Sequence, residues 1–275
     1  TIFIDNRSEE KNYNDRMRYE GYLYSPQYAL IPIYGKMRVF GVITIATLPD
    51  SEIFLSQYDI VLLEFFSHQI GIALENAELN DKIEKFYRNL ILTFSNLIEF
   101  RDHSTAGHCD RLIKLVKLLA QKLNLEDFEI RELELAAAMH DIGKICTPDA
   151  ILNKPAKLTT EEYEEIKKHA IKGSEIVSPL SDYDKVIAGI KHHHERWDGT
   201  GYPDGLKGED IPFYARIIAV ADSFDVMLNS RPYKKAMDIT AAKKEILACS
   251  GKQFDPHIAK LLLEIPDAII INLQK

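Results

Sequence analysis

The sequence predicts a mainly α-helical protein, in which a C-terminal helical bundle follows a smaller α+β domain and a long linking helix. Three observations indicate this. Residues from 108 onward form a series of amphipathic segments, residues 28–48 alternate like a β-hairpin, and an almost unbroken helical pattern joins the two regions. The 275 residues are too many for one small core, so we expect two compact units.

The first unit begins with two apolar runs, residues 28–34 and 39–46, and Tyr34-Gly35-Lys36 between them is typical of a turn. A helical pattern then runs from about Gln57 to Phe100, with apolar residues recurring at Ile60, Leu63, Phe66, Ile70, Leu74, Ala77 and Ile83. A helix of this length often pairs with a copy of itself, so we predict a parallel homodimer through residues 57–100. Two shorter helices that meet near Asn80-Asp81 are the alternative.

Six helices are expected in the C-terminal region. The first carries an apolar stripe at Leu112, Leu115, Val116, Leu119 and Leu123. The second spans residues 128–140, and Thr159 with Glu162 forms a capping box that opens the third. The remaining three are expected at residues 184–195, 213–228 and 256–263.

Composition excludes several classes of protein. With 46% hydrophobic and 28% charged residues the chain is expected to fold, and a net charge of −8 disfavours binding to long nucleic acids. No apolar run reaches about 18 residues and no secretory signal is visible, so we expect no membrane segment in this chain. Three cysteines without a CxxC pair predict a reducing, cytoplasmic location.

Histidine and aspartate side chains are expected on the buried faces of several helices. They are His140 and Asp141 at the end of an apolar helix, His169, His193 and His194, and Asp222 within an apolar run. One inward histidine is more often a core residue with a hydrogen-bond partner than a ligand. Six or seven such groups are harder to satisfy separately, because each unpartnered one costs up to several kcal/mol.

A shared metal centre would satisfy these groups together. Imidazole and carboxylate ligands without thiolate favour Fe, Mn, Co, Ni or Zn in a hydrolytic site. The adjacent His140-Asp141 pair suits two metals, because one carboxylate can bridge them. Two metals roughly 3.5–4 Å apart can activate a water and stabilise the departing oxygen of a phosphate ester.

Two further segments indicate a ligand pocket. The loop from Glu195 to Gly205 contains three glycines directly after the two histidines, which fits a close approach of a ligand. Arg231, Lys234 and Lys235 follow the helix of Asp222. Such a run usually lies on a solvated surface, and a clamp on substrate phosphates is the alternative.

These motifs resemble the HD-GYP family. His140-Asp141-Ile142-Gly143-Lys144 resembles its HD motif, and the run from His193 to Pro203 resembles its extended GYP signature. Arg101-Asp102, Gly107-His108 and Arg231-Pro232-Tyr233 are similar to further family positions. The resemblance covers roughly residues 85–265. It implies an HD-type helical bundle that hydrolyses cyclic di-GMP to pGpG or GMP at a centre of two or three metals, commonly iron or manganese.

The resemblance also implies a role for each matching residue. One metal would be held by His108, His140, Asp141 and Asp222, and the second by His169, His193, His194 and the bridging Asp141. Lys144 would lie beside the scissile phosphate, Asp102 would position substrate or water, and Arg231 and Lys234 would bind phosphates. Gly201, Tyr202 and Pro203 would shape the pocket wall, and His192 is expected on the surface.

Three-metal members often carry a glutamate four residues before the first histidine. This chain has Ser104 there, which favours two divalent ions and leaves a third open.

The N-terminal third resembles part of a GAF domain. The resemblance rests on Ala29–Gly35, on Val39–Ile43 and on the segment Leu62–Glu78, which is similar to the closing helix of that family. It implies a partial GAF-like sensory domain over residues 1–80, with no strand expected before residue 28.

The leading hypothesis is therefore a cytoplasmic, metal-dependent cyclic di-GMP phosphodiesterase regulated by its N-terminal domain. A receptor that binds the cyclic dinucleotide and signals to partner proteins is the alternative. The complete ligand set argues against this alternative, and Ser104 keeps it open. An HD phosphohydrolase for another nucleotide is a third hypothesis, which the Gly-Tyr-Pro loop disfavours.

Overall fold

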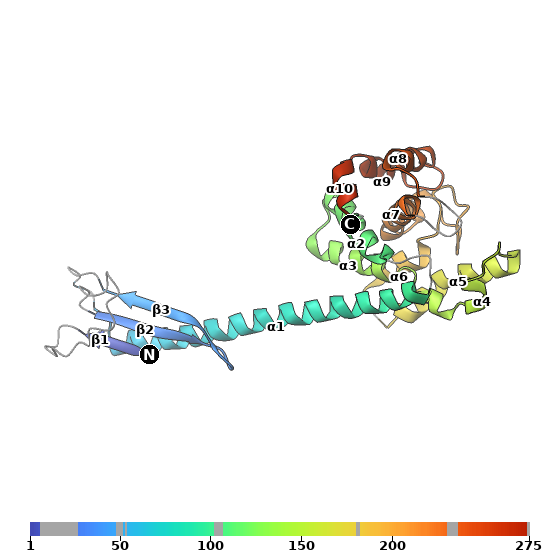
Figure 1. Ribbon diagram of the computed structural model, residues 1–275. Coiled ribbons are helices and arrows are strands. Elements are labelled where there is room, and N and C mark those ends of the chain that lie inside the picture. The colour runs from blue at the N-terminus through green and yellow to red at the C-terminus, as the bar shows by residue number, and fades with distance from the viewer. Residues whose placement is uncertain are drawn as a thin grey trace. The chain divides into compact units, whose positions relative to one another are not determined.

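A computed structural model describes residues 1–5, 27–47, 52, 54–101, 107–179, 182–229 and 236–273. The chain divides into two compact units, residues 1–87 and 88–275, and the protein is mainly helical, as predicted (Figure 1). Helix α1 (Gln57–Arg101) continues from the first unit into the second as one helix of 45 residues. The predicted long helix is confirmed, and no joint interrupts it near Asn80.

The N-terminal unit contains an antiparallel sheet of order β1-β2-β3, formed by β1 (Ile2–Asp5), β2 (Gln27–Tyr34) and β3 (Val39–Ala46). The hairpin of β2 and β3 was predicted correctly. The expectation of no strand before residue 28 was wrong, since Ile2 in β1 pairs with Leu30 in β2. Four residues are too few to show the alternation that identifies a strand from sequence.

The first half of α1 packs on this sheet. Ile60 is buried with Ala29 and Ile31, and the Ser67 hydroxyl donates to the Pro32 carbonyl at 2.7 Å. A Cβ at Gly71 would lie 1.8 Å from the Tyr34 carbonyl oxygen, so the helix and the strand meet backbone to backbone. Other residues of the recurring apolar positions, Ile70, Leu74 and Ile83, are exposed in the single chain.

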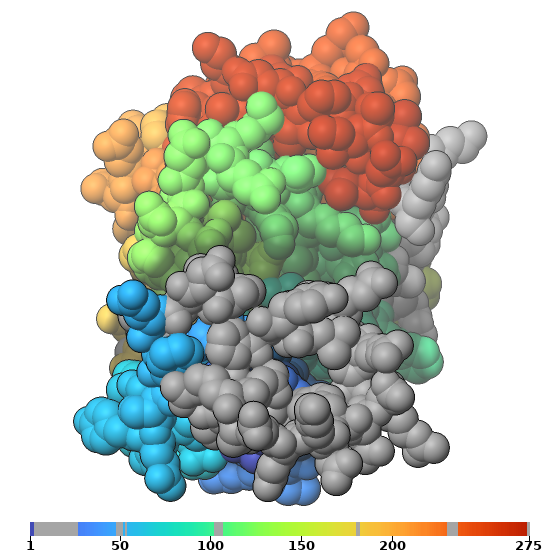
Figure 2. Space-filling view, turned by 90° about the vertical axis from the view of Figure 1, so that its left-hand side faces the viewer, coloured from blue at the N-terminus to red at the C-terminus, as the bar shows by residue number. Residues whose placement is uncertain are grey.

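The C-terminal unit is a helical bundle. Its α-helices are α2 (His108–Lys122), α3 (Asp127–Met139), α4 (Asp149–Leu152), α5 (Thr160–Val177), α6 (Asp184–His192), α7 (Phe213–Leu228), α8 (Ile239–Ala248), α9 (Pro256–Leu263) and α10 (Asp267–Leu273). Two 3₁₀ segments, η1 (Ile142–Cys146) and η2 (Gly208–Asp210), lie between them. In Figure 2 the red C-terminal helices lie against the green segment of α2 and α3, in agreement with the contacts of α9 and α10 with α2.

One hydrophobic core connects these helices. Leu112, Leu115, Val116 and Leu119 of the predicted α2 stripe are buried in it, and α7 contributes Ile217, Ile218 and Phe224. The capping box of α5 is present, with Thr159 Oγ1 accepting the Glu162 N–H at 3.3 Å. The fourth helix was predicted too long, because α6 ends at His192 and a turn follows. Helices α4, α8 and α10 were not predicted.

Candidate metal centre

Seven predicted ligands from five parts of the bundle gather in two groups. The first group comprises His108, His140 and Asp222, and the second comprises Asp141, His169, His193 and His194. Within each group the possible ligand atoms all lie within 4.8 Å of one another. His108 begins α2, His140 and Asp141 follow α3, His169 lies on α5, His193 and His194 follow α6, and Asp222 lies on α7.

A glycine brings the second group together. The backbone of η1, directly after Asp141, lies against α5 at His169. A Cβ at Gly143 would be 1.9 Å from the His169 carbonyl oxygen and 2.5 Å from the Gly173 nitrogen. Only a residue without a side chain permits this approach, so Gly143 allows Asp141 and His169 to face the same space.

The histidine rings are oriented by their outer nitrogens. The Nδ1 atoms of His140, His169 and His193 lie 2.7–2.8 Å from the carbonyl oxygens of Ala137, Ile166 and Ile190, respectively, each three residues earlier. A carbonyl only accepts, so each Nδ1 must carry the proton and each Nε2 presents its lone pair. Such outer hydrogen bonds are the usual support of metal-ligating histidines.

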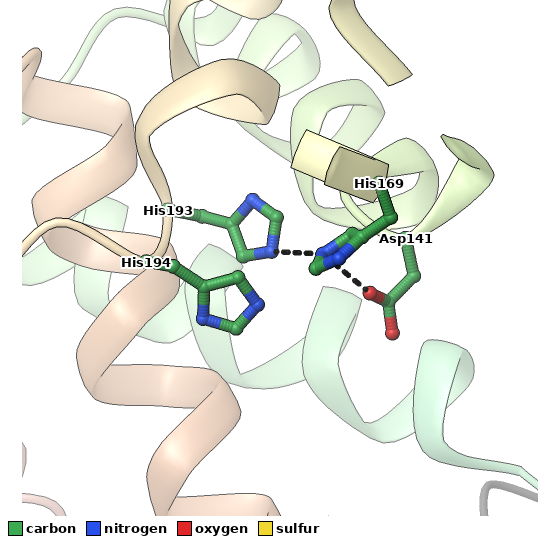
Figure 3. Close-up of side chains that lie close together, drawn as sticks. All are labelled: Asp141, His169, His193 and His194. Carbon is green, nitrogen blue, oxygen red and sulfur yellow. Dashed lines mark hydrogen bonds and ion pairs between the residues drawn. The ribbon is translucent and has the colours of Figure 1, made fainter. Parts of the chain in front are cut away.

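The chemistry of this donor set fits a bound cation. Nε2 of His169 and Nε2 of His193 are 3.3 Å apart (Figure 3). Because both Nδ1 atoms are protonated, two neutral rings would turn lone pairs toward each other. Their mutual repulsion is relieved when a metal ion accepts both lone pairs.

Asp141 presents one oxygen to each group. Its Oδ1 lies 3.4 Å from Nε2 of His169, and its Oδ2 lies 3.3 Å from Nε2 of His140. Lys144 Nζ is 2.8 Å from the same Oδ2. A carboxylate in this position is suited to bridge two cations.

The pKa values indicate that the side chains of the second group are in the protonation state that binds a metal ion. Burial lowers the pKa of His169 and of His193, and it lowers the pKa of His194 to about 3, so these rings stay neutral. Burial alone would raise the pKa of Asp141, but Lys144 and His140 outweigh it and hold that pKa well below the usual value. The carboxylate is therefore ionised.

In the first group, by contrast, the protonated form of a histidine is favoured when no metal is bound. Burial disfavours the charged form of His108, but the hydrogen bonds that His108 donates to Asp222 and Asp225 outweigh this and raise the pKa of His108 to about 10. A metal ion that binds at this group would therefore displace a proton from His108.

Comparison with known proteins assigns the bundle to a family. A family model described as an HD domain matches residues 93–258, which is more than half of the chain. The chain belongs to the HD domain family. All seven residues of the two groups lie within the matched region.

Curated relatives are similar over about three quarters of this chain. The chain is 43% identical over 200 residues to the cyclic di-GMP phosphodiesterase response regulator RpfG of Xanthomonas campestris, covering 71% of this chain and 53% of that protein. It is 36% identical over 220 residues to 3'3'-cGAMP-specific phosphodiesterase 2 of Vibrio cholerae, covering 78% and 42%. The chain thus spans about half the length of the curated relatives it matches.

A solved structure has the same fold. The crystal structure of the V. cholerae cyclic GMP-AMP-specific phosphodiesterase V-cGAP3 matches with a TM-score of 0.52 and 21% identity, over 68% of this chain and 52% of that one. At this identity the match supports the fold alone.

Beside the two groups, the HD domain has a cavity of about 600 Å³. Three cationic side chains line it, Lys144, Lys167 and Arg196, together with His169, His193, His194, Asp222 and Gln253. Gly201 and Tyr202 form part of its wall, and the Tyr202 ring stacks on His194 with centroids 4.8 Å apart. Asp102, Ser104, Arg231 and Lys234 lie outside the described residues.

Two supporting carboxylates were missed in the sequence. Asp225 Oδ2 is 2.8 Å from Nδ1 of His108, and its Oδ1 accepts from Arg111 at 2.8 Å. Asp225 follows Asp222 by three residues on the same helix, and this spacing could have predicted that the two carboxylates share a face. Glu195 Oε1 accepts the backbone N–H groups of Asp204 and Gly205 at 2.8 and 3.0 Å, and this closes the glycine-rich loop.

The expectation for His192 was wrong. Its side chain is 11% exposed, and its Nε2 lies 3.0 Å from Asp204 Oδ2. His192 is thus a partly buried contact between α6 and the loop that holds Tyr202.

Proposed function

We propose that this HD domain is of the HD-GYP type and hydrolyses a cyclic dinucleotide, cyclic di-GMP, to pGpG or GMP in a metal-dependent reaction. The names of the relatives support the substrate class, since they include both cyclic di-GMP and 3'3'-cGAMP phosphodiesterases. The position of Asp141 carries the proposal, because its two oxygens face the two ligand groups.

The residues present fit two divalent ions, and iron or manganese suits their nitrogen and oxygen donors. His108, His140 and Asp222 would hold one ion, His169, His193 and His194 the other, and Asp141 would bridge. When bound, the pair would neutralise charge that develops on the reacting phosphodiester. A third ion stays open.

The cavity beside the centre supports roles for the chain's own cations. Lys144 lines it and is 2.8 Å from Asp141, so its ammonium can donate to the phosphate that undergoes hydrolysis. Lys167 and Arg196 line the same cavity and suit the second phosphate of a cyclic dinucleotide. Asp102, Arg231 and Lys234 keep their proposed roles in positioning substrate. Gly201 and Tyr202 would shape the wall that the bases meet.

The proposal extends to the N-terminal unit. Its three-stranded sheet with a packed helix is consistent with a partial GAF-like sensory domain, and α1 provides a continuous connection to the HD domain. We propose that the protein acts in the cytoplasm as a homodimer and that α1 transmits a signal to the catalytic unit. None of the described helices is long and apolar enough to cross a bilayer.

Metal analysis and turnover on one sample test the proposed function. Anaerobically prepared protein loaded with Fe²⁺ or Mn²⁺ should contain about two ions per chain and linearise cyclic di-GMP, with 3'3'-cGAMP assayed in parallel. The Asp141→Ala variant should lose both ions and all detectable turnover, because both groups share this carboxylate. Asp110→Ala, an exposed aspartate on α2, is the matched control and should behave as wild type.

Two other outcomes of these measurements would contradict the proposed function. A full metal complement without turnover of either dinucleotide would support the receptor alternative. Turnover that persists in Asp141→Ala would exclude the assigned centre.

A further inference from the structure

We propose that Ser95, Glu99 and Arg101, in the last two turns of α1, are positioning residues for the first ligand group and for Lys144. This inference rests on the proposed function and adds a physical route for its regulation. Each of the three side chains makes a hydrogen bond to the backbone of a different segment that carries a residue of the centre.

Ser95 fixes the end of α3. Its side chain is buried, and its hydroxyl donates to the Ala138 carbonyl oxygen at 2.6 Å. Ala138 lies two residues before His140, in the last turn of the helix, where backbone carbonyls lack partners within the helix. The contact therefore sets the position at which His140 and Asp141 leave α3.

Glu99 caps the start of α2. Gly107 precedes this helix and has no side chain to cap it. The Glu99 carboxylate takes that role from another helix, because Oε2 accepts the Gly107 N–H at 3.0 Å and Oε1 accepts the Cys109 N–H. These two N–H groups flank His108, so Glu99 fixes the backbone from which that ligand projects.

Arg101 holds η1. Its guanidinium donates to the carbonyl oxygens of Lys144, Ile145 and Thr147 at 3.1, 2.7 and 2.7 Å, and to Asp149 Oδ1 at 2.7 Å. In return Asn153 donates to the Arg101 carbonyl at 3.1 Å. Charge-assisted bonds from one rigid fork thus fix the turn that places Lys144 beside Asp141.

The three histidines of the second group lack such support from α1. Within the described ranges, no hydrogen bond or ion pair joins α1 to α5 or α6, which carry or precede His169, His193 and His194. By contrast, Ser95 and Glu99 share with His108, His140 and Asp141 a gap of only about 20 Å³. A movement of the end of α1 would therefore disturb the first group and Asp141, and it would leave the supports of His169, His193 and His194 in place.

Metal titration of the full chain tests this inference. Co²⁺ would be added to metal-free wild type, Arg101→Gln and Glu99→Gln, and followed by its visible absorption spectrum. His108→Ala and His169→Ala would identify the spectral bands of the first and second groups. Glu99→Gln should bind Co²⁺ about 10–100-fold more weakly at the first group, which is the usual effect of losing an outer support, and normally at the second. Arg101→Gln should weaken binding at every ion that Asp141 ligates, because Arg101 fixes the turn that follows Asp141.

The conservative Arg101→Lys keeps the positive charge but loses the planar fork of donors, and it should give an intermediate affinity. Arg88→Gln is the matched control, since Arg88 lies on the same helix and is 3.8 Å from Glu134, away from both groups. Its titration should match that of wild type.

Three outcomes would overturn the inference. Unchanged binding in Glu99→Gln or in Arg101→Gln would exclude the positioning role of that residue, and equal weakening at both groups in Glu99→Gln would indicate general destabilisation. Arg101→Lys decides the question if Arg101→Gln does not fold, because wild-type affinity in that variant also excludes the role. If wild type binds no Co²⁺, the proposed metal centre itself fails.

Discussion

Asp225 shows how one residue outside the ligand set controls a ligand. Its carboxylate lies 2.8 Å from Nδ1 of His108, and Arg111 donates to it in turn. The carboxylate accepts a hydrogen bond from Nδ1–H, so that Nε2 faces Asp222 at 3.2 Å from Oδ1. Carboxylate support of this kind increases the basicity of a metal-ligating imidazole.

Replacing Asp225 with asparagine should therefore weaken metal binding at the first group. The amide keeps the size of the side chain but removes the negative charge that favours electron donation by His108. We expect about 10–100-fold lower affinity for Mn²⁺ or Co²⁺ at that group, measured by titration of metal-free protein. Asp110→Asn, on the exposed face of α2, should leave the affinity unchanged. Equal affinity in Asp225→Asn and wild type would mean that Arg111 and Asp225 serve packing alone.

For single residues, the sequence predicts the site from the polar side chains that interrupt an apolar helical pattern. The histidines and aspartates that the sequence places on inward faces lie close together in the structure, since helical spacing fixes which residues share a face. The contacts of Glu195 and Arg101 were not predicted, because their partners lie further along the chain, such as Asp204 for Glu195 and Thr147 for Arg101. Periodicity within one element contains no information about such contacts.

The second group depends on the contact between η1 and α5. The two backbones approach so closely at Gly143 that no side chain fits between them. A well-packed interior does not adjust to added volume without moving backbone, so this contact fixes the distance between Asp141 and His169.

The Gly143→Ala variant should separate these elements. Overpacking usually costs 1–3 kcal/mol, and the obstacle here is backbone, so we expect a loss of about 3 kcal/mol in the free energy of unfolding. For a unit of this size the Tm should fall by roughly 6–12 °C, with loss of metal from the second group. Gly41→Ala is the control, because its Cβ would meet only Ile33 Cδ1 at 3.9 Å. A Gly143→Ala variant that keeps wild-type Tm and metal content would contradict the role of this contact.

Whole elements were predictable where the pattern was long and bounded by clear signals. The bounds of α7 and α9 match the prediction, because Pro212 and Pro256 mark their starts. The end of α6 was missed, since His193 and His194 continue the helical spacing although the backbone turns after His192. Strand β1 is defined by its pairing with β2, a partner more than twenty residues away.

At the scale of the whole molecule, α1 presents a continuous apolar stripe. Alternating steps of four and three residues select thirteen positions, ten of them apolar: Tyr58, Leu62, Phe65, Gln69, Ile72, Asn76, Leu79, Ile83, Phe86, Leu90, Thr93, Leu97 and Phe100. Phe86, Leu97 and Phe100 are 64%, 61% and 85% exposed. The residues that face the sheet and the bundle, such as Ile60 and Ser95, lie outside this series. A heptad repeat of this length is typical of a coiled coil.

The stripe therefore predicts that two copies pair through α1, in parallel, with Asn76 fixing the register as a polar residue at an inward position. Light scattering at micromolar concentration should give twice the 31.4 kDa mass of the chain. Leu90→Lys should give the monomer mass, because the symmetric interface would bury two unpaired charges at a cost of several kcal/mol. Asn89→Lys, exposed one position away and outside the series, should remain dimeric. A monomeric wild type would contradict the pairing, and a dimeric Leu90→Lys would place the interface elsewhere.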